Sequence, residues 1–410
     1  MRRPVKPRRV SSIIALLSAA LVTCGRQTEG PTVDPKTSTW PAIELAARGQ
    51  QVYFIMWTGD PAINRYMQDF VVPRVRERFG IELKIVPGQA DIPTMLSNEI
   101  AAGQAVSNTD MVWINGETFF KLRQIKALYG PFTSKLPSDR YVDWRNPRIA
   151  NDFQQTVDGY EAPWGNVQLL LIVNADAVPN PPRDPASLLQ WIKAHPGRFT
   201  FDTAFTGLSF LKSLMYAFAE DQHALQGAFD EALYLRLRDR VFAWVRQARP
   251  ALWRAGKTFP KDIGQIHQLF ANGEVDFTMS FNDGEADNKV AIGLFPRAAR
   301  AYALTTGTLA NSHYLGIVAR SAHKAAAMVV INELQSAEAQ YEKQKPSTWG
   351  DGTVLDTARL PPPWPARFAA IPGRERAPPR AELAALSLPE PAPEYMIRLE
   401  RDFREQIIRD

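Results

Sequence analysis

The apolar residues of the chain fall into short unbroken runs and helical repeats that alternate along its length. Residues 52–57 form one such run, which is typical of a strand buried on both faces of a sheet. Apolar side chains then recur at helical spacing from Ile63 to Val75, and residues 81–86 indicate a second strand. This order predicts a β-α-β unit, the building block of a doubly wound α/β sheet.

The same alternation continues through the rest of the chain and predicts an α/β protein. Further strands are expected over residues 110–114, 167–174, 198–201, 275–280 and 313–318. Helices are expected over residues 118–128, 186–194, 208–218, 285–290 and 324–343. The proline-rich residues 361–393 are expected to run extended along the surface, and an amphipathic helix over about 394–408 closes the chain.

The first residues indicate an export signal. Residues 1–9 are basic, and residues 13–22 form an apolar run that is short for a membrane span but suits a signal-peptide core. The following Leu21–Gly25 segment resembles a bacterial lipobox, in which Cys24 would become the lipidated first residue. We expect a signal peptide over 1–23, a tether over 24–46 and a periplasmic protein whose membrane contact is a lipid on Cys24. The alternative is ordinary cleavage, with Cys24 lost or idle.

Composition and charge exclude several classes of function. The 410-residue chain has a net charge of +5, but residues 1–23 hold five basic residues and no acid, so the remainder is neutral and gives no argument for nucleic-acid binding. One cysteine allows no intrachain disulfide, and no later segment is long and apolar enough to cross a membrane. The five histidines have no zinc-ligand spacing, and neither a phosphate loop nor a dinucleotide glycine motif is present. We therefore expect no metal and no cofactor.

Four predicted strand-to-helix turns combine aromatic and polar residues: 57–60, 113–116, 202–206 and 281–284. Ligands of open α/β sheets bind beyond the carboxyl ends of the strands, where such residues supply flat walls and hydrogen-bond acceptors. The candidate ligand-binding residues from these turns are Trp57, Thr58, Asp60, Trp113, Asn115, Gly116, Asp202, Phe205, Thr206, Asn282, Asp283 and Glu285.

Each candidate also has a plain structural interpretation. Asp60 and Asp202 can cap the helices that follow them, and Asn115 with Gly116 can be turn chemistry alone. Trp57 and Trp113 can be core residues, and residues 282–284 can be a surface turn. The recurrence of the same mixture at four turns favours a binding site.

Several motifs in order resemble a known family. They are residues 56–60, 112–116, 162–168, 195–200 and, most specifically, 269–285. Over about Gln51 to Leu360 the chain resembles the type II periplasmic solute-binding proteins of ABC importers. Within extracellular family 1 it is most similar to the YnjB-like branch, which is related to thiamine-, polyamine- and iron-binding proteins.

The resemblance implies an α/β fold of two lobes, each a mixed sheet flanked by helices, with a hinge between them. The chain would cross near 163–173 and again near 305–316. Lobe 1 would then comprise residues 47–163 and 306–345, lobe 2 residues 164–305, and residues 346–410 would pack on both. The resemblance also adds four ligand contacts: Trp164, Asn311, His313 and Trp349.

The expected function is therefore the substrate-binding component of an ABC importer. It is a monomeric, non-enzymatic receptor whose partners are a permease, its ATPase and a small solute. The alternatives are a secreted enzyme such as a glycosidase, which predicts turnover, and a structural envelope lipoprotein, which predicts no ligand.

The charges of the turns suggest a ligand class. Asp60, Asp202, Asp283 and Glu285 have no lysine or arginine beside them in the four turns. Because buried carboxylates need a counter-charge, this pattern favours a cationic solute, such as a thiamine-type compound or a polyamine. The alternative is an oxyanion held by the same helix N-termini.

Overall fold

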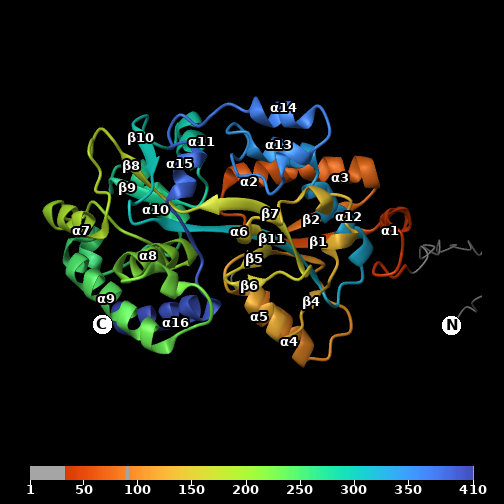
Figure 1. The fold of residues 1–410 in the computed structure, drawn as a ribbon, viewed down its shortest axis with the longest axis horizontal. Helices are drawn as coiled ribbons and strands as arrows, with labels where there is room; N and C mark the ends of the chain where they lie inside the picture. Colours follow the sequence, from red (N-terminus) through yellow and green to blue (C-terminus); the bar gives the residue numbers. More distant parts are fainter. Residues whose placement is uncertain (1–32, 89–91, 410) are drawn as a thin grey trace, which may run out of the picture. The chain divides into compact units, whose positions relative to one another are not determined.

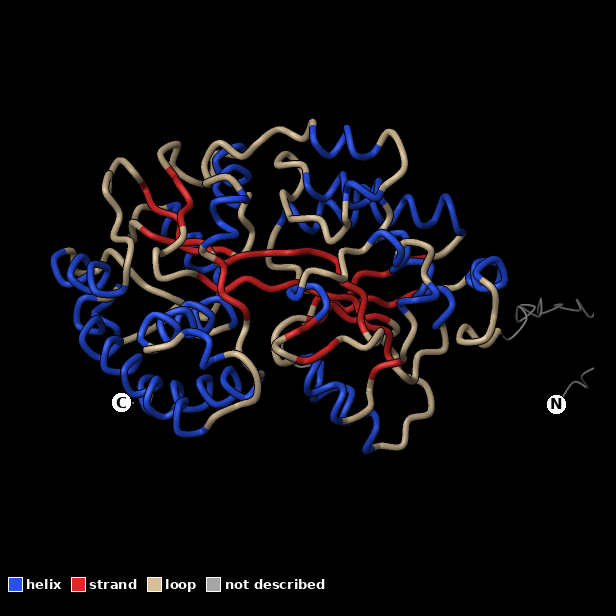
Figure 2. Tube along the Cα trace, viewed as in Figure 1, coloured by secondary structure: helices blue, strands red, loops and turns tan. Residues whose placement is uncertain are grey.

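A computed structural model describes residues 33–88 and 92–409. The predicted signal peptide, Cys24 and the first part of the predicted tether lie outside these residues. The described residues form two sheets that are covered by helices and a separate pair of two-residue strands (Figures 1 and 2).

The larger sheet has seven strands in the order β12-β11-β3-β1-β2, with β4 and β7 also pairing with β11. They are β1 (Gln51–Met56), β2 (Glu82–Pro87), β3 (Met111–Ile114), β4 (Leu128–Tyr129), β7 (Glu161–Gln168), β11 (Thr308–Val318) and β12 (Ser387–Pro389). The predicted β-α-β unit is confirmed, because β1 and β2 pair in parallel from Gln51 with Glu82 to Met56 with Pro87. The helical segments between them are α2 (Pro61–Arg65), η1 (Tyr66–Val71) and α3 (Val72–Phe79).

The smaller sheet has three strands, β10 (Ala299–Tyr302), β8 (Leu170–Asn174) and β9 (Phe277–Ser280). Both of its pairings are antiparallel, so this sheet is not mixed as predicted. In Figure 1 the helices around it are α7 (Pro185–Ala194), α8 (Phe205–Phe218), α9 (Glu231–Ala248), α10 (Ile263–Ala271), α11 (Glu285–Ala291) and α16 (Pro393–Phe403).

Residues 198–201 form no strand, although their apolar pattern predicted one. Phe199 and Phe201 are fully buried in the core beside the smaller sheet, and the Phe199 carbonyl accepts the Trp253 N–H. Their alternation therefore reflects burial of the side chains, without pairing of the backbone in a sheet.

Two neighbouring segments connect the sheets. Strand β7 continues into β8 with only Leu169 between them, and β10 is followed closely by β11. Strands β7 and β11 pair antiparallel from Gln168 with Ala310 to Glu161 with Gly316. The chain thus passes between the sheets along two hydrogen-bonded strands.

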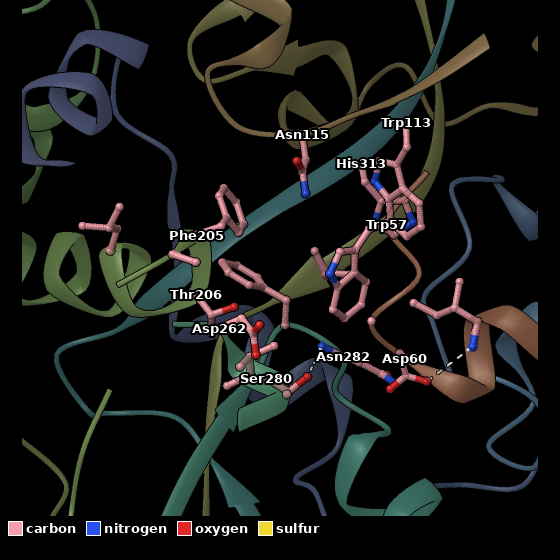
Figure 3. A pocket seen from close by; sticks show the side chains of 18 of the residues that line it. Trp57, Asp60, Trp113, Asn115, Phe205, Thr206, Asp262, Ser280, Asn282 and His313 are labelled. Carbon is pink, nitrogen blue, oxygen red and sulfur yellow. Dashed lines mark hydrogen bonds between the residues drawn. The ribbon is translucent and has the colours of Figure 1, made fainter. Parts of the chain in front are cut away.

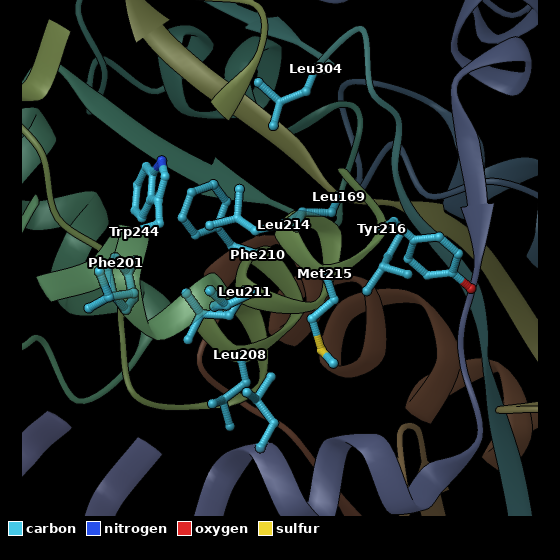
Figure 4. Packing of buried hydrophobic residues seen from close by; sticks show 14 of the residues in the cluster. Leu169, Phe201, Leu208, Phe210, Leu211, Leu214, Met215, Tyr216, Trp244 and Leu304 are labelled. Carbon is cyan, nitrogen blue, oxygen red and sulfur yellow. The ribbon is translucent and has the colours of Figure 1, made fainter. Parts of the chain in front are cut away.

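Each sheet has its own core. Helix α8 is the centre of the core beside the smaller sheet, with Phe210, Leu211 and Leu214 buried among the side chains of α9 and α16 (Figure 4). Separate clusters of buried residues pack against the larger sheet. The two parts of the fold can therefore keep their internal packing if their relative position changes.

Three segments have a different secondary structure from the one predicted from the sequence. Residues 40–46 belong to helix α1 (Trp40–Ala47), which packs on α12 (Lys324–Leu334) through buried Ile43 and so is not a free tether. The helix predicted over 324–343 is interrupted at Ser336, whose side chain accepts the Ala339 N–H and begins α13 (Ala337–Gln344). The region predicted to be extended contains α14 (Trp364–Ala369), α15 (Arg380–Ala385) and β12 between its prolines.

The remaining α-helices and β-strands lie on the larger sheet's side of the fold (Figure 1). They are α4 (Ile92–Ala101), α5 (Thr118–Gln124), α6 (Pro147–Ala150), β5 (Asn151–Asp152) and β6 (Gln155–Thr156).

Candidate functional site

A cavity of about 800 Å³ is lined by residues from both parts of the fold. This volume suits a small-molecule ligand. Of the predicted site residues, the structure brings together in its lining Trp57, Thr58, Asp60, Trp113, Asn115, Phe205, Thr206, Asn282, Glu285, Asn311, His313 and Trp349. Figure 3 shows Trp57, Trp113 and His313 on one side of it and Phe205, Thr206 and Ser280 on the other.

The turn between β1 and α2 supplies the first wall. Asp60 caps α2, because its Oδ1 accepts the Ala62 N–H at 2.6 Å, and the same residue lines the cavity. Gly59 lies under the Trp57 ring, and a Cβ at this position would come within 2.5 Å of that ring. Glycine at this turn therefore allows the indole to fold back along the cavity wall.

An aromatic cluster forms the wall on the side of β3 and β11. The His313 imidazole stacks on Trp349, with ring centroids 5.6 Å apart and planes at 15°, and lies 4.8 Å from the Trp113 ring. Trp164 is fully buried and does not line the cavity; its ring lies edge-on behind Trp113 at 4.9 Å. The structure therefore places Trp164 as packing support for the wall.

The acids of two turns meet a lysine that the sequence reasoning missed. Lys289 Nζ of α11 lies 2.5 Å from Asp60 Oδ2 and 3.1 Å from Glu285 Oε1. Burial raises the pKa of Asp60, but the Lys289 ammonium outweighs burial and leaves this pKa below its ordinary value. Burial, together with the neighbouring Asp60, raises the pKa of Glu285 to about 7. Glu285 and Lys289 are four residues apart on one helix, and this i,i+4 spacing was the available signal.

Asp283 and Asp202 lie outside the cavity lining. Asp283 pairs with Arg374 Nη1 at 2.5 Å and Arg380 Nε at 2.9 Å. Asp202 is buried behind the start of α8, where its Oδ1 accepts the Ala204 N–H at 2.8 Å and the Gly207 N–H at 3.2 Å. The structure therefore places neither acid in the cavity lining, and the backbone N–H groups at the start of α8 account for one carboxylate oxygen of Asp202. Burial raises the pKa of Asp202 to about 6.

Gly116 also does not line the cavity. Its φ of +64° is a left-handed conformation that favours glycine, and a Cβ there would come within 3.0 Å of the Phe205 ring. Turn geometry and the close approach of Phe205 therefore explain why position 116 is a glycine.

A second buried charge cluster lies behind the aromatic wall. Asp351, which lines the cavity, pairs with Lys343, and its Oδ2 lies 3.2 Å from His313 Nε2. Burial lowers the pKa of His313 despite Asp351, so its imidazole is neutral at pH 7. Gly165 of β7 makes room for the cluster, because a Cβ there would lie 2.0 Å from Asp351 Oδ2.

The other charged residues of the lining also have partners of opposite charge. Glu117 pairs with Lys121 at 2.9 Å, Glu400 pairs with Arg404 at 2.7 Å, and Asp262 lies 3.9 Å from Lys261. His267 Nε2 donates to the Met279 carbonyl, and burial lowers its pKa to about 4, so it is also neutral at pH 7. Sequence reasoning had no signal for these pairs as parts of a cavity.

Neither a metal site nor a membrane span is found in the part of the chain that the structure describes. Residues 33–88 and 92–409 contain no cluster of three or more His, Cys, Asp or Glu side chains arranged to hold a metal ion. No helix in the same residues combines the length and apolar character needed to cross a bilayer.

Two comparisons of sequence identify relatives. Residues 71–371 match the sequence profile of the family described as bacterial extracellular solute-binding protein. Protein YnjB of Escherichia coli (strain K12) is 37% identical over 329 residues, which cover 79% of this chain and 84% of YnjB.

Solved structures share the fold at low sequence identity. The Tp0655 (TpPotD) lipoprotein of Treponema pallidum has a TM-score of 0.60 at 13% identity, covering 88% of this chain and 100% of that one. AfuA of Actinobacillus pleuropneumoniae, solved with fructose-6-phosphate, has a TM-score of 0.61 at 11% identity, covering 87% and 98%. Iron-bound HitA of Pseudomonas aeruginosa has a TM-score of 0.58 at 16% identity, covering 86% and 98%.

These neighbours are type II periplasmic binding proteins of two lobes, and this fold is shared here. AfuA was solved with a sugar phosphate and HitA with iron, so the fold alone does not determine a ligand. From the family match and the relative in Escherichia coli, the chain belongs to the bacterial extracellular solute-binding proteins, the substrate-binding components of ABC importers.

Proposed function

We propose that this chain captures a small solute reversibly in the cavity described above and delivers it to the permease and ATPase of an ABC importer. The observation that carries the proposal is that both parts of the fold contribute residues to the cavity walls. Trp57 follows β1 and Trp113 lies in β3, both of the larger sheet, whereas Phe205 and Asn282 come from the side of the smaller sheet. A solute in this cavity contacts both parts of the fold at once.

Contact with both parts couples binding to closure. We propose that lobe 1 comprises residues 47–163 and 306–345, that lobe 2 comprises 164–305, and that the β7–β8 and β10–β11 connections act as the hinge. A solute that touches both lobes only when they are closed shifts the population toward that state. Changing a 1:99 mixture to 99:1 requires about 5.5 kcal/mol of differential binding. The importer would then recognise the closed form.

The proposed role requires no chemistry on the solute. A glycosidase needs a carboxylic acid and a second carboxylate free to act on either side of the bond. Here Asp60 and Glu285 both contact Lys289, and Asp351 contacts Lys343, which suits these acids to structural pairing. Recovery of the bound solute with unchanged mass supports capture, whereas release of a product of different mass supports the secreted enzyme.

Export and attachment complete the proposal. We propose that residues 1–23 are removed, that Cys24 carries a lipid in the periplasm, and that the receptor acts as a monomer. The motivating feature is the order of basic residues, apolar run and Cys24. Mass analysis of the mature N-terminus tests this proposal, and a chain retaining Arg2 contradicts it.

The central experiment measures solute and closure together. Native mass spectrometry of the purified protein identifies a co-purifying solute, and solution scattering is then recorded with and without it. We expect a smaller radius of gyration at saturation. Trp57→Ala removes one wall of the cavity and should weaken binding about tenfold or more. Saturating solute that leaves the scattering unchanged contradicts the hinge, and the absence of binding by any class of solute contradicts the function.

A further inference from the structure

Lys289 lies between two acids of the cavity wall and does not itself line the cavity, and we call this position the acidic recess. Its side chain is only 3% exposed, and its ammonium lies between Asp60 of the β1–α2 turn and Glu285 of α11. Asp60 and Glu285 line the cavity. A cationic group of a bound solute would seek this same position between two carboxylates, so the protein already supplies the cation there.

The recess joins the two parts of the fold. Asp60 follows a strand of the larger sheet, whereas Glu285 and Lys289 lie on the helix after β9 of the smaller sheet. Glu285 Oε2 also accepts from Asn282 Nδ2 at 3.3 Å, and Asn282 Nδ2 donates to the Trp349 carbonyl at 3.0 Å. Moving Lys289 aside for a cationic solute would therefore disrupt contacts on both sides of the cavity.

The energetic consequence is a penalty against charged solutes. A cation entering the recess must displace the Lys289 ammonium into a buried site without its partners, which costs several kcal/mol in general. An anion would have to approach Asp60, whose pKa stays below its ordinary value because of Lys289. An uncharged solute meets neither penalty, and it can use the tryptophan faces and the hydroxyl side chains of Thr58 and Thr206.

We propose that Lys289 is a specificity-determining residue: its ammonium stands in for a ligand cation, so the cavity takes uncharged, hydroxyl-bearing solutes and rejects amines. The ligand class rests on the proposed function, because it assumes that the cavity holds the transported solute. The role of Lys289 in filling the acidic recess does not depend on the natural solute being known.

The test is a chemical rescue: a variant loses the Lys289 ammonium, and a small amine is added to replace it. In Lys289→Ala the recess holds Asp60 and Glu285 without a cation, and ethylammonium chloride is the probe. We expect ethylammonium to raise the melting temperature of this variant by at least about 2 °C relative to sodium chloride at equal ionic strength. Wild type and Lys289→Arg, which keep a cation in the recess, should show no such rise.

A matched control separates this site from any buried lysine. Lys212 pairs with Glu390 at 2.5 Å, both side chains are buried, and neither residue lines the cavity. Lys212→Ala should therefore gain no stability from ethylammonium, because the probe has no open path to Glu390. An equal response of Lys212→Ala and Lys289→Ala overturns the proposal, since the probe would then act generally.

A second variant covers the case in which Lys289→Ala does not fold. Asp60→Asn combined with Lys289→Met removes one carboxylate and the ammonium and leaves Glu285, whose pKa burial raises to about 7, so this variant should fold without ethylammonium. If this double variant folds while Lys289→Ala stays unfolded at all ethylammonium concentrations, the proposal is overturned. Refolding of Lys289→Ala by ethylammonium supports it.

The wild-type protein tests the ligand class directly. Melting curves are recorded with putrescine, choline and thiamine, with phosphate and sulfate, and with a set of neutral sugars and nucleosides. We expect a shift only within the uncharged set. A shift by a cation in the wild type, or by anions alone, overturns the ligand class. Absence of any shift, together with unchanged scattering, overturns the proposed function while the ethylammonium result for Lys289→Ala still stands by itself.

Discussion

Two regions of this molecule neutralise their buried acids differently. Beside the cavity, Asp60 and Glu285 contact Lys289, and Asp351 contacts Lys343. On the other side of β11, Asp152 and Glu161 are as deeply buried, yet their four carboxylate oxygens accept no hydrogen bond from the residues that the structure describes.

In the second region, the acids Asp152 and Glu161 are neutralised by protonation. Burial first, and then the neighbouring Glu390, raises the pKa of Asp152 well above its ordinary value. Burial and the neighbouring Asp152 do the same for Glu161. A carboxyl group without a cation binds a proton because an isolated buried charge is expensive. The comparison teaches that a buried acid by itself does not indicate a cationic ligand, since a lysine or a proton of the protein can neutralise it.

The largest expected effect comes from removing the lysine of a fully buried pair. Lys343→Met leaves Asp351 and the neighbouring His313 without the ammonium. We expect a loss of about 3–5 kcal/mol of unfolding free energy, measured by urea denaturation at pH 7. Adding Asp351→Asn should restore much of this loss. A single variant that loses less than about 1 kcal/mol would show that the cavity clusters do not rely on lysine.

The next effect concerns Asp202, a buried acid that has no lysine contact among the described residues. Its folded pKa of about 6 lies above the ordinary aspartate value of 3.8, so its contribution to stability is present below pH 4 and is lost as the pH rises through 6. Wild type should lose roughly 2–3 kcal/mol through this group over that range. Asp202→Asn keeps an oxygen for the cap and should flatten the profile, as measured by denaturation between pH 4 and 7.5. Equal slopes for both proteins would contradict the assignment.

A smaller effect distinguishes protonated acids from paired ones. Glu161→Gln replaces a carboxyl whose pKa is raised, so its stability contribution also falls as the pH rises. We expect the variant to be at least as stable as wild type at pH 8, with a gain of about 1 kcal/mol. Asp351→Asn is the matched control and should be less stable at the same pH, because it leaves Lys343 unpaired. If both variants are less stable than wild type at pH 8, the two regions do not neutralise their acids differently.

The smallest effect concerns an acid paired near the surface. Asp283 lies outside the cavity and contacts Arg374, which is 7% exposed, and Arg380, which is 41% exposed. Asp283→Asn should cost about 1 kcal/mol of unfolding free energy or less. The affinity for the native solute should stay within about twofold, as measured by calorimetry. A tenfold loss of affinity would indicate that Asp283 contributes to solute binding after all.

Much of the fold could be predicted because local patterns carry it. The apolar run of residues 52–57 and the helical repeat that follows indicated the β-α-β unit, and the structure confirms it. The same reasoning failed at residues 198–201, where apolar side chains are buried without forming a strand. Periodicity reports which side chains face a core, and it does not report which backbone groups pair.

The candidate site was predictable in part for the same reason. Strand-to-helix turns lie at the edge of a sheet, and most of the residues proposed from them line one cavity. Gly116, Asp202 and Asp283 do not, because a turn can place a side chain toward the cavity, behind the wall or under a helix. Sequence order does not distinguish these directions.

The sequence by itself determined the order of strands and helices, the family and the turns that reach the cavity, because each depends on residues close together in the chain. Only the tertiary structure decided the charge of the site. Lys289 meets Asp60 across 229 positions, and Arg380 meets Asp283 across 97. Electrostatic energy depends on distance in space and on burial, and neither can be read from the local sequence.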